Sequence, residues 1–197
     1  MLDDHRWEKT AVRKLIIWNI VTLDGYFEGR NKWQIDFHNL VWGPELEQLC
    51  RTFGDNTAAL IFGRTTYEGM ASYWATAEAS EIKTYMNGLP KLVASRTLKQ
   101  AEWNNSQVTS DIIVEVGRLR QENDGKVLYV FGSADLSDTL LKEGLVDEIM
   151  LCVAPTILGG GTPLFKHSSH QHNLSLLEAR ALRSGGVILR YVPKLED

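Results

Sequence analysis

The chain has 197 residues, of which 44% are hydrophobic and 23% are charged, and its formal net charge is -4. This length predicts one domain over residues 1–197, with a core from about 13 to 192, that buries roughly 70% of the surface of the unfolded chain. The composition has no excess of basic charge, which argues against binding to a nucleic-acid backbone, because such binding requires a concentrated basic face.

Cysteine usage and the first residues predict the compartment. Cys50 and Cys152 are far apart and neither belongs to a C-x-x-C pair, which argues against a disulfide framework and a zinc site. The start, "MLDDHRWEKTAVR", has no apolar stretch of the kind found in secretory signals. Apolar runs are far shorter than the ~20 residues of a membrane span. We therefore expect a cytoplasmic protein that binds neither membrane nor nucleic acid.

Five apolar runs rich in β-branched residues recur along the chain. They are "KLIIWNIV" at 14–21, "AALIF" at 58–62, "KLVAS" at 91–95, "VLYVF" at 127–131 and "EIMLCVAP" at 148–155. Their apolar residues are continuous rather than alternating. This indicates strands covered on both faces, as in a largely parallel sheet between two layers of helices.

Helical patterns fill the segments between these runs. "SDIIVEVGRLRQENDG" begins with Ser110 as its capping residue and ends near Gly125. "SADLSDTLLKEGL" follows the same design, with Gly144 as its stop. Further helices are expected to begin at Thr65 or Thr66 and to cover about 78–87.

The end of the chain has a different pattern. "LSLLEARAL" at 174–182 and "GVILRYV" at 186–192 alternate more strongly, and "RSGG" between them is typical of a hairpin. We therefore predict an α/β fold with three layers, α/β/α, whose mostly parallel mixed sheet ends in a C-terminal antiparallel hairpin.

The strongest candidate for a ligand-binding site is the point where the apolar run at 58–62 ends. Gly63, Arg64, Thr65 and Thr66 follow a strand and open a helix, at the edge of the sheet where α/β folds bind ligands. A helix N-terminus attracts anions, and an arginine fork suits a phosphate. The alternative is that Arg64 pairs with a surface carboxylate while the threonines cap the helix.

Two other strand ends carry similar residues. Ser95 and Arg96 follow one strand, and Gly132 and Ser133 follow another, directly before a helix. A glycine at such a turn lets the backbone approach a phosphate, although an ordinary strand-to-helix turn would use it equally well. The G-x-G-x-x-G fingerprint of dinucleotide-binding folds is missing.

Together, four stretches resemble the dihydrofolate-reductase-like superfamily, and most closely the reductase domain of the bifunctional riboflavin-biosynthesis deaminase-reductase. They are "TLDGYFEG", "IFGRTTYEGM", "LVASRTL" and "VFGSADLSDTLLKEGLVDEIMLCVAPTILGGGTPLF". The resemblance covers about 13–192. It implies the dihydrofolate-reductase-like fold, an NADPH-dependent reductase activity on a heterocyclic substrate, and a homodimer.

The resemblance also implies roles for single residues. Arg64 would face the 2'-phosphate of NADPH, and Thr66 would face the pyrophosphate. The family often has two glycines where Gly132 and Ser133 stand, in a turn that touches the pyrophosphate. The implied cofactor-binding residues are Leu23, Asp24 and Gly25 in the loop over the nicotinamide, Gly63, Arg64, Thr65 and Thr66, Ser95 and Arg96 along the adenosine, and Gly132 and Ser133.

Hydride transfer to a C=N bond is easier when the nitrogen is protonated, and a carboxylic acid in an apolar pocket is suited to supply that proton. Asp36 in "KWQIDFHNLVW" lies among aromatic residues, roughly where the superfamily places its substrate-facing acid. It is our candidate catalytic residue. Glu45 is the second candidate, although "GPELEQLC" is more simply the start of a helix.

Two loops remain open to interpretation. "ILGGGTPLF" has three glycines in a row, and the resemblance places it near the substrate, so Gly160 and Gly161 are candidate substrate contacts. A flexible turn is equally consistent with them. "KHSSHQH" brings together His167, His170 and His172, and its polar setting favours a solvated loop, so we expect no metal site.

The leading hypothesis is a reductase most like 5-amino-6-(5-phosphoribosylamino)uracil reductase, which transfers hydride from NADPH. The zinc deaminase motifs H-x-E and P-C-x-x-C are absent from the sequence. One alternative is dihydrofolate reductase, for which the stretch "MNGLPKLVA" offers Lys91 where folate enzymes have an arginine. Another is a non-catalytic NADP-binding domain.

Overall fold

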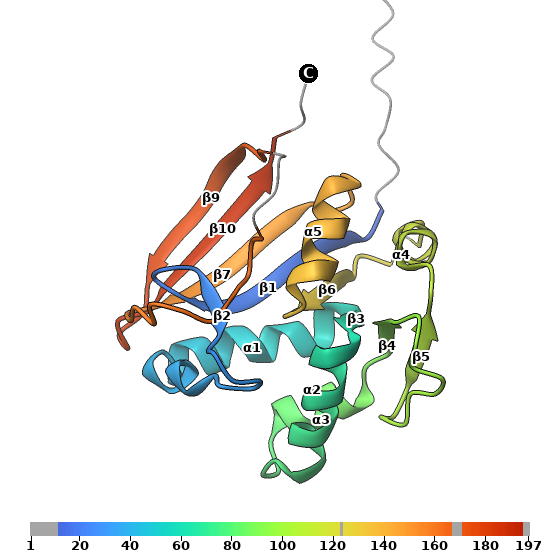
Figure 1. Ribbon diagram of the computed structural model, residues 1–197, viewed down its shortest axis with the longest axis horizontal. Coiled ribbons are helices and arrows are strands. Elements are labelled where there is room, and N and C mark those ends of the chain that lie inside the picture. Colours follow the sequence, from blue (N-terminus) through green and yellow to red (C-terminus); the bar gives the residue numbers. More distant parts are fainter. Residues whose placement is uncertain (1–11, 123, 167–170, 195–197) are drawn as a thin grey trace, which may run out of the picture.

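The computed structural model describes residues 12–122, 124–166 and 171–194, and one sheet of eight strands forms its centre. The strands are β1 Lys14–Thr22, β3 Thr57–Gly63, β4 Lys91–Ala94, β5 Ser106–Thr109, β6 Val127–Phe131, β7 Glu148–Ala154, β9 Leu174–Ala181 and β10 Val187–Pro193. They follow the order β5-β4-β3-β6-β1-β7-β10-β9 (Figure 1). Pairing is parallel from β5 to β7 and antiparallel from β7 to β9.

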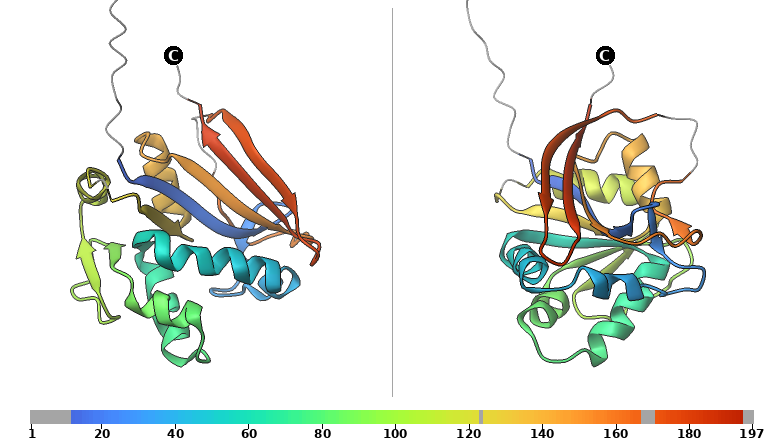
Figure 2. Two further views of the ribbon diagram at one scale, coloured as in Figure 1. Left: turned by 180° about the vertical axis from the view of Figure 1, so that it is seen from behind. Right: turned by 90° about the vertical axis from the view of Figure 1, so that its left-hand side faces the viewer.

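Helices cover both faces of the sheet, which confirms the predicted three-layer fold with its C-terminal hairpin (Figure 2). One face carries α1 Pro44–Asn56, α2 Arg64–Thr76, α3 Glu81–Gly88 and the short 3-10 helix η1 Asp36–Leu40. The other face carries α4 Ile112–Arg120 and α5 Ala134–Lys142.

The continuous apolar run of β1 is explained by these two layers. Leu15 and Ile17 are fully buried toward α5, whereas Ile16, Trp18 and Ile20 pack in the core under α1 and α3. Successive side chains of a strand point to opposite faces, so a strand covered on both sides needs apolar residues at nearly every position.

An ion pair fastens the C-terminal hairpin to the parallel part of the sheet. Arg190 of β10 donates two hydrogen bonds to Glu148 of β7, with distances of 2.6 and 3.1 Å, and a third to Glu178 of β9. Glu148 is 2% exposed. A buried carboxylate is tolerated when it is paired and hydrogen-bonded in this way.

Several boundaries differ from the expected ones. Asp111, rather than Ser110, caps α4 by accepting a hydrogen bond from the amide of Val114, and α4 ends at Arg120. The helix expected to begin at 65 or 66 begins at Arg64, and α3 begins at 81 rather than 78. The sequence analysis also missed β5 and a small sheet of β2 Tyr26–Glu28 and β8 Thr162–Pro163.

Both cysteines are buried free thiols, which agrees with the expectation of no disulfide framework. Burial raises the pKa of each thiol to about 12, so both stay protonated near neutral pH. Within residues 12–122, 124–166 and 171–194, none of the helices combines the length and apolarity needed to cross a membrane.

Candidate active site

The carboxyl ends of β3 and β6 meet at the predicted ligand-binding edge of the sheet. Ser133 Oγ accepts a hydrogen bond from the amide of Gly63 at 2.8 Å and donates one to Thr66 Oγ1 at 2.8 Å. A Cβ on Gly132 would come within 2.8 Å of the Thr66 side chain, so only glycine fits there. These four residues, Gly63, Thr66, Gly132 and Ser133, are called the β3–β6 edge below.

Two helices begin at this edge without a side-chain cap. Gly63 precedes α2 and has no side chain that could act as a cap. Ser133 precedes α5, and its side chain accepts no hydrogen bond from the first turn of that helix. The first amides of both helices are therefore available to an anion, and the positive ends of both helix dipoles point to the same edge.

Arg64 lies at the start of α2 and links two of the predicted strand ends. Its Nε donates to Glu68 at 2.7 Å, and its Nη1 donates to Thr97 Oγ1 at 2.8 Å. The pairing with a surface carboxylate, one of the two alternatives, is thus present. The side chain is 48% exposed, and such a surface pair is weak enough for a phosphate to replace it.

The strand end after β4 lies beside Arg64. Ser95 Oγ accepts hydrogen bonds from the amides of Thr97 and Leu98 and so shapes the turn that presents Thr97 to Arg64. Arg96 is exposed. Thr65 is exposed in the first turn of α2. The role of these residues along the adenosine stays a prediction.

The loop after β1 is tied to the glycine-rich loop. The Asp24 carboxylate accepts hydrogen bonds from the amides of Leu158 and Gly159 and from the hydroxyl of Thr22. These bonds lower the pKa of Asp24, with the Thr22 hydroxyl as the largest cause. Asp24 therefore holds two loops together, while Leu23 beside it is 66% exposed.

Gly160 and Gly161 are packed against the end of β2 and the segment that follows it. A Cβ on Gly161 would lie 2.3 Å from the carbonyl oxygen of Glu28, and one on Gly160 would meet the guanidinium of Arg30. Close approach between the two loops thus accounts for both glycines. Neither is among the residues that line the cavity described next, and their contact with a substrate stays a prediction.

A cavity of about 430 Å³ opens beside the β3–β6 edge, on the face covered by α1, α2 and α3. We call it the aromatic cavity. It reaches Thr66 and Gly132 at the edge of the sheet and Tyr85 and Met86 on α3. Nine of its lining residues have aromatic rings other than imidazole: Trp18, Phe27, Trp33, Trp42, Phe53, Tyr73, Trp74, Tyr85 and Phe131.

Three nitrogen atoms in this lining are buried without a hydrogen-bond partner among the described residues: Asn19 Nδ2, His38 Nε2 and Trp74 Nε1. A buried polar group without a partner is unfavourable by about 1–3 kcal/mol. Burial lowers the pKa of His38 to about 4, so its ring is neutral at neutral pH. Three such groups around one aromatic space indicate a polar, planar ligand.

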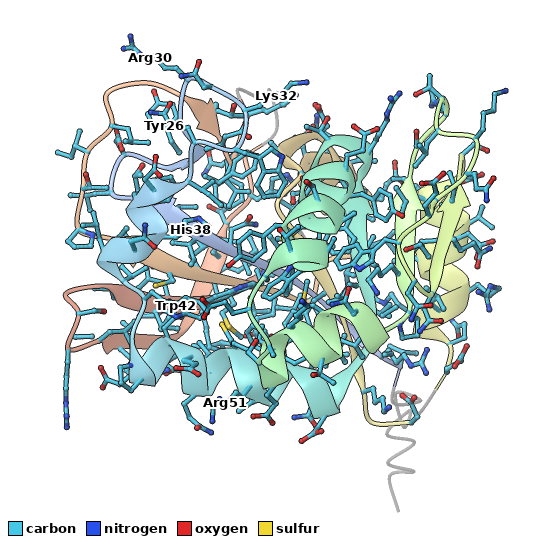
Figure 3. The ribbon with its side chains drawn as sticks, turned by 90° about the horizontal axis from the view of Figure 1, so that it is seen from below. Tyr26, Arg30, Lys32, His38, Trp42 and Arg51 are labelled. Carbon is cyan, nitrogen blue, oxygen red and sulfur yellow. The ribbon has the colours of Figure 1, made fainter. Side chains whose placement is uncertain are left out.

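These three residues were missed by sequence reasoning. Asn19 had a signal, because it is a polar residue inside the apolar run "KLIIWNIV". The sequence around His38 and Trp74 contains no comparable signal. Figure 3 shows His38 and Trp42 between α1 and the loop that carries Arg30 and Lys32.

The candidate acids occupy different places. Asp36 lines the aromatic cavity, but the expected apolar burial is wrong, because the residue is exposed at the start of η1. Glu28 also lines the cavity, and its carboxylate accepts hydrogen bonds from the Trp33 amide and the Thr162 hydroxyl. Glu45 is outside this lining and accepts a hydrogen bond from the Arg183 amide.

Lys91 is not available to a substrate carboxylate. It is 2% exposed, and its Nζ donates hydrogen bonds to the carbonyl oxygens of Asn87, Leu89 and Asn104. The same nitrogen lies 4.4 Å from the centroid of the Trp103 ring. Burial lowers the pKa of Lys91 to about 8. This lysine joins α3 to the loop before β5.

The histidine-rich segment is described in part. His167 and His170 lie outside the described residues, and His172 is exposed. Across the described part of the chain, no three histidine, cysteine or acidic side chains come together in a way that could hold a metal ion.

Comparisons with known proteins identify the family and the fold. The sequence model of the RibD C-terminal domain family matches residues 13–188. The uncharacterised protein YyaP of Bacillus subtilis (strain 168) is 30% identical over 183 residues, which cover 91% of this chain and 94% of YyaP.

Two solved structures illustrate the likeness in fold. A protein of Shewanella sp. PV-4 that was proposed to act in riboflavin biosynthesis has a TM-score of 0.75 and 19% identity, covering 92% of this chain and 99% of that one. Dihydrofolate reductase of Enterococcus faecalis, complexed with NADP(H) and RAB-propyl, has a TM-score of 0.59 and 13% identity, covering 91% and 96%.

Proposed function

The chain belongs to the RibD C-terminal domain family, and from that premise we propose that it is an NADPH-dependent reductase. It transfers hydride to a planar heterocycle of the pyrimidine or pteridine kind, most like 5-amino-6-(5-phosphoribosylamino)uracil. The observation that carries this proposal is the aromatic cavity, which adjoins the β3–β6 edge and contains three buried nitrogens that find no hydrogen-bond partner in the described part of the chain.

The β3–β6 edge supports the cofactor part of the proposal. Two uncapped helix N-termini and Arg64 provide amides, dipoles and a fixed cation for the phosphates of a dinucleotide. The residues present fit NADPH in this respect. When bound, NADPH would supply the hydride, and the protein would align the two rings and exclude water.

The cavity supports the substrate part. Aromatic walls favour a flat ring, and the neutral imidazole of His38 and the indole of Trp74 can hydrogen-bond to its edge. Asp36 at the rim remains our candidate for the proton donor. The buried position of Lys91 argues against dihydrofolate as the substrate, because its ammonium group is already bonded to the protein.

A thermal-shift experiment tests the cofactor. NADPH at about 100 times its Kd should raise the free energy of unfolding by roughly 2.7 kcal/mol, and NADH should raise it less. Arg64→Ala should weaken NADPH binding but leave NADH binding unchanged. Arg51→Ala is a matched control, because Arg51 forms an equivalent pair with Glu47 at 2.7 Å on α1 and points outward (Figure 3).

Turnover with a heterocyclic substrate separates an enzyme from a non-catalytic NADP-binding domain. Asp36→Asn should lower kcat, by about 10²–10⁴-fold if Asp36 supplies the proton, and leave the Kd of NADPH unchanged. Glu45→Gln serves as the control, since Glu45 lies outside the aromatic cavity. A protein that binds NADPH but turns over no pyrimidine or pteridine substrate would be the non-catalytic form.

Association is a further part of the proposal. We expect a homodimer formed through the C-terminal hairpin, because β9 is the last strand of the sheet and its leucines at 174, 176 and 177 are 36–56% exposed. Unpaired edge strands with apolar side chains favour pairing with a second chain. The expected cytoplasmic location and the single domain likewise stay predictions.

A further inference from the structure

Asn19 has an unusual position for a polar residue. It lies on β1 in the interior of the sheet, between β6 and β7, and is 6% exposed. The neighbouring residues Trp18 and Ile20 are buried and apolar. A buried side-chain amide is unfavourable unless its hydrogen-bonding groups find partners, so the reason for an amide at this position lies in what each of its two ends contacts.

One end of the amide has a clear partner. Asn19 Oδ1 accepts a hydrogen bond from the amide of Gly132 at 2.9 Å and so holds the β3–β6 edge in place. Asn19 Nδ2 is buried and has no partner among the described residues. Holding Gly132 requires an acceptor alone, so the nitrogen is not explained by this structural role.

The surroundings indicate what the nitrogen binds. Asn19 lines the aromatic cavity together with Thr66 and Gly132 of the β3–β6 edge. It therefore lies at the junction of the proposed cofactor and substrate positions. Because the oxygen is engaged by Gly132, the group that remains for a ligand is the N–H donor, which pairs with an acceptor such as a carbonyl oxygen.

We propose that Asn19 is a specificity-determining residue whose Nδ2 donates a hydrogen bond to a carbonyl oxygen of the bound ligand. This inference rests on the proposed function. Two ligands can present this oxygen at the junction: the carboxamide of the nicotinamide ring, or an oxo group on the heterocyclic substrate. The same side chain holds Gly132, so it joins ligand recognition to the position of the β3–β6 edge.

Two substitutions separate ligand recognition from the structural role. Asn19→Asp, studied at pH 8, keeps an acceptor for the Gly132 amide but loses the donor. Asn19→Leu loses both. If Asn19 acted only by holding Gly132, the aspartate would bind ligands as the unmodified protein does, and the leucine alone would be impaired. Ligand recognition requires both variants to bind more weakly.

The measurements are dissociation constants of NADPH and of lumazine, a pteridine-2,4-dione, taken separately from the quenching of tryptophan fluorescence. For both variants we expect about a tenfold loss of affinity for one of the two probes. A loss of affinity for NADPH would identify the nicotinamide carboxamide as the acceptor of the Asn19 hydrogen bond. A loss of affinity for lumazine would identify the oxo group of the substrate as that acceptor. Ser106→Ala is the control, because Ser106 Oγ is also buried with no partner among the residues that the structure describes, but lies on β5, away from the cavity.

The outcomes distinguish this inference from the proposed function. If the unmodified protein binds NADPH and the aspartate variant binds both probes equally well, the role of Asn19 is overturned and the reductase proposal stands. If the unmodified protein binds neither probe, both are overturned. Circular dichroism and thermal unfolding of each variant identify a variant that fails to fold, in which case the other variant decides.

Discussion

Ser133 shows how a single side chain can hold a strained turn. Its φ of 62° and ψ of 71° lie in the left-handed region, which is unfavourable for residues other than glycine. Its hydroxyl, however, joins the amide of Gly63 to the hydroxyl of Thr66. The two hydrogen bonds explain how serine can stand where the resemblance led us to expect a second glycine.

This balance predicts different results for two substitutions at Ser133. Ser133→Ala keeps the left-handed strain and loses both hydrogen bonds, so the free energy of unfolding should fall by about 1–3 kcal/mol. Ser133→Gly loses the same bonds but removes the strain, worth roughly 1 kcal/mol, so it should be less destabilising. Urea unfolding measures both. An alanine variant as stable as the glycine variant would contradict this account.

His38 predicts a dependence of stability on pH. Burial lowers the pKa of its ring to about 4 from 6.5. Between these values the unfolded chain binds a proton and the folded protein does not, so the free energy of unfolding should fall as the pH drops from 6.5 toward 4. The contribution of His38 is at most about 3 kcal/mol.

Urea unfolding at pH 7 and pH 4.5 tests this dependence. His38→Gln should lose less stability between the two pH values than the unmodified protein does. His172→Gln, at an exposed position away from the aromatic cavity, is the control and should behave like the unmodified protein. Equal losses in all three proteins would show that the His38 ring does not titrate as expected.

The elements that the sequence predicted best are those whose surroundings are uniform. Buried parallel strands such as β1 and β6 need apolar residues throughout, so they were recognised from residue type alone. β5 was missed because Ser106–Thr109 has a single apolar residue and owes its strand conformation to pairing with β4. The ends of helices depended on caps, as at Asp111, that compete with neighbouring serines.

Helix α2 carries a glycine whose role comes from packing. A Cβ on Gly69 would lie 1.6–1.9 Å from atoms of the Trp33 indole, which lines the aromatic cavity. Gly69→Ala must displace this ring, so the free energy of unfolding should fall by about 1–3 kcal/mol and the fluorescence of Trp33 should change.

A matched glycine on another helix isolates this effect. Gly117 is inside α4, and a Cβ there would meet nothing within 4 Å. Gly117→Ala should therefore stabilise the protein by roughly 0.5–1 kcal/mol, since alanine loses less conformational freedom in a helix than glycine. Chemical denaturation should move the two variants in opposite directions. A stabilising Gly69→Ala would mean that Trp33 is not held against α2.

At the scale of the whole molecule, the sequence predicted which strand ends would meet but not the cavity beside them. Parallel strands bring their carboxyl ends to one edge, so Gly63 and Gly132 could be expected together. Many of the residues that line the cavity come from α1, α2, α3, η1 and the loop before η1, and the packing of these elements against the sheet has no local signature in the sequence. For the same reason the apolar burial expected for Asp36 was wrong, and the buried position of Lys91 could not be predicted.

The C-terminal hairpin leads to the last prediction, which concerns the assembly. The outer edge of β9 has no neighbour among the described strands. Leu176 belongs to this strand, and its side chain is 56% exposed. If two chains associate through this edge, Leu176→Arg should convert the dimer into a monomer, because a buried charge without a partner opposes association.

Sedimentation velocity at equal protein concentrations measures this change. Val114→Arg is the control, since Val114 is 61% exposed on α4, away from the hairpin, and should leave the dimer intact. The residues that line the aromatic cavity and form the β3–β6 edge lie outside β9 and β10. NADPH binding should therefore survive in the monomeric variant. If the unmodified protein is a monomer, the proposed dimer is excluded. If the Leu176→Arg variant is still a dimer, the interface lies elsewhere.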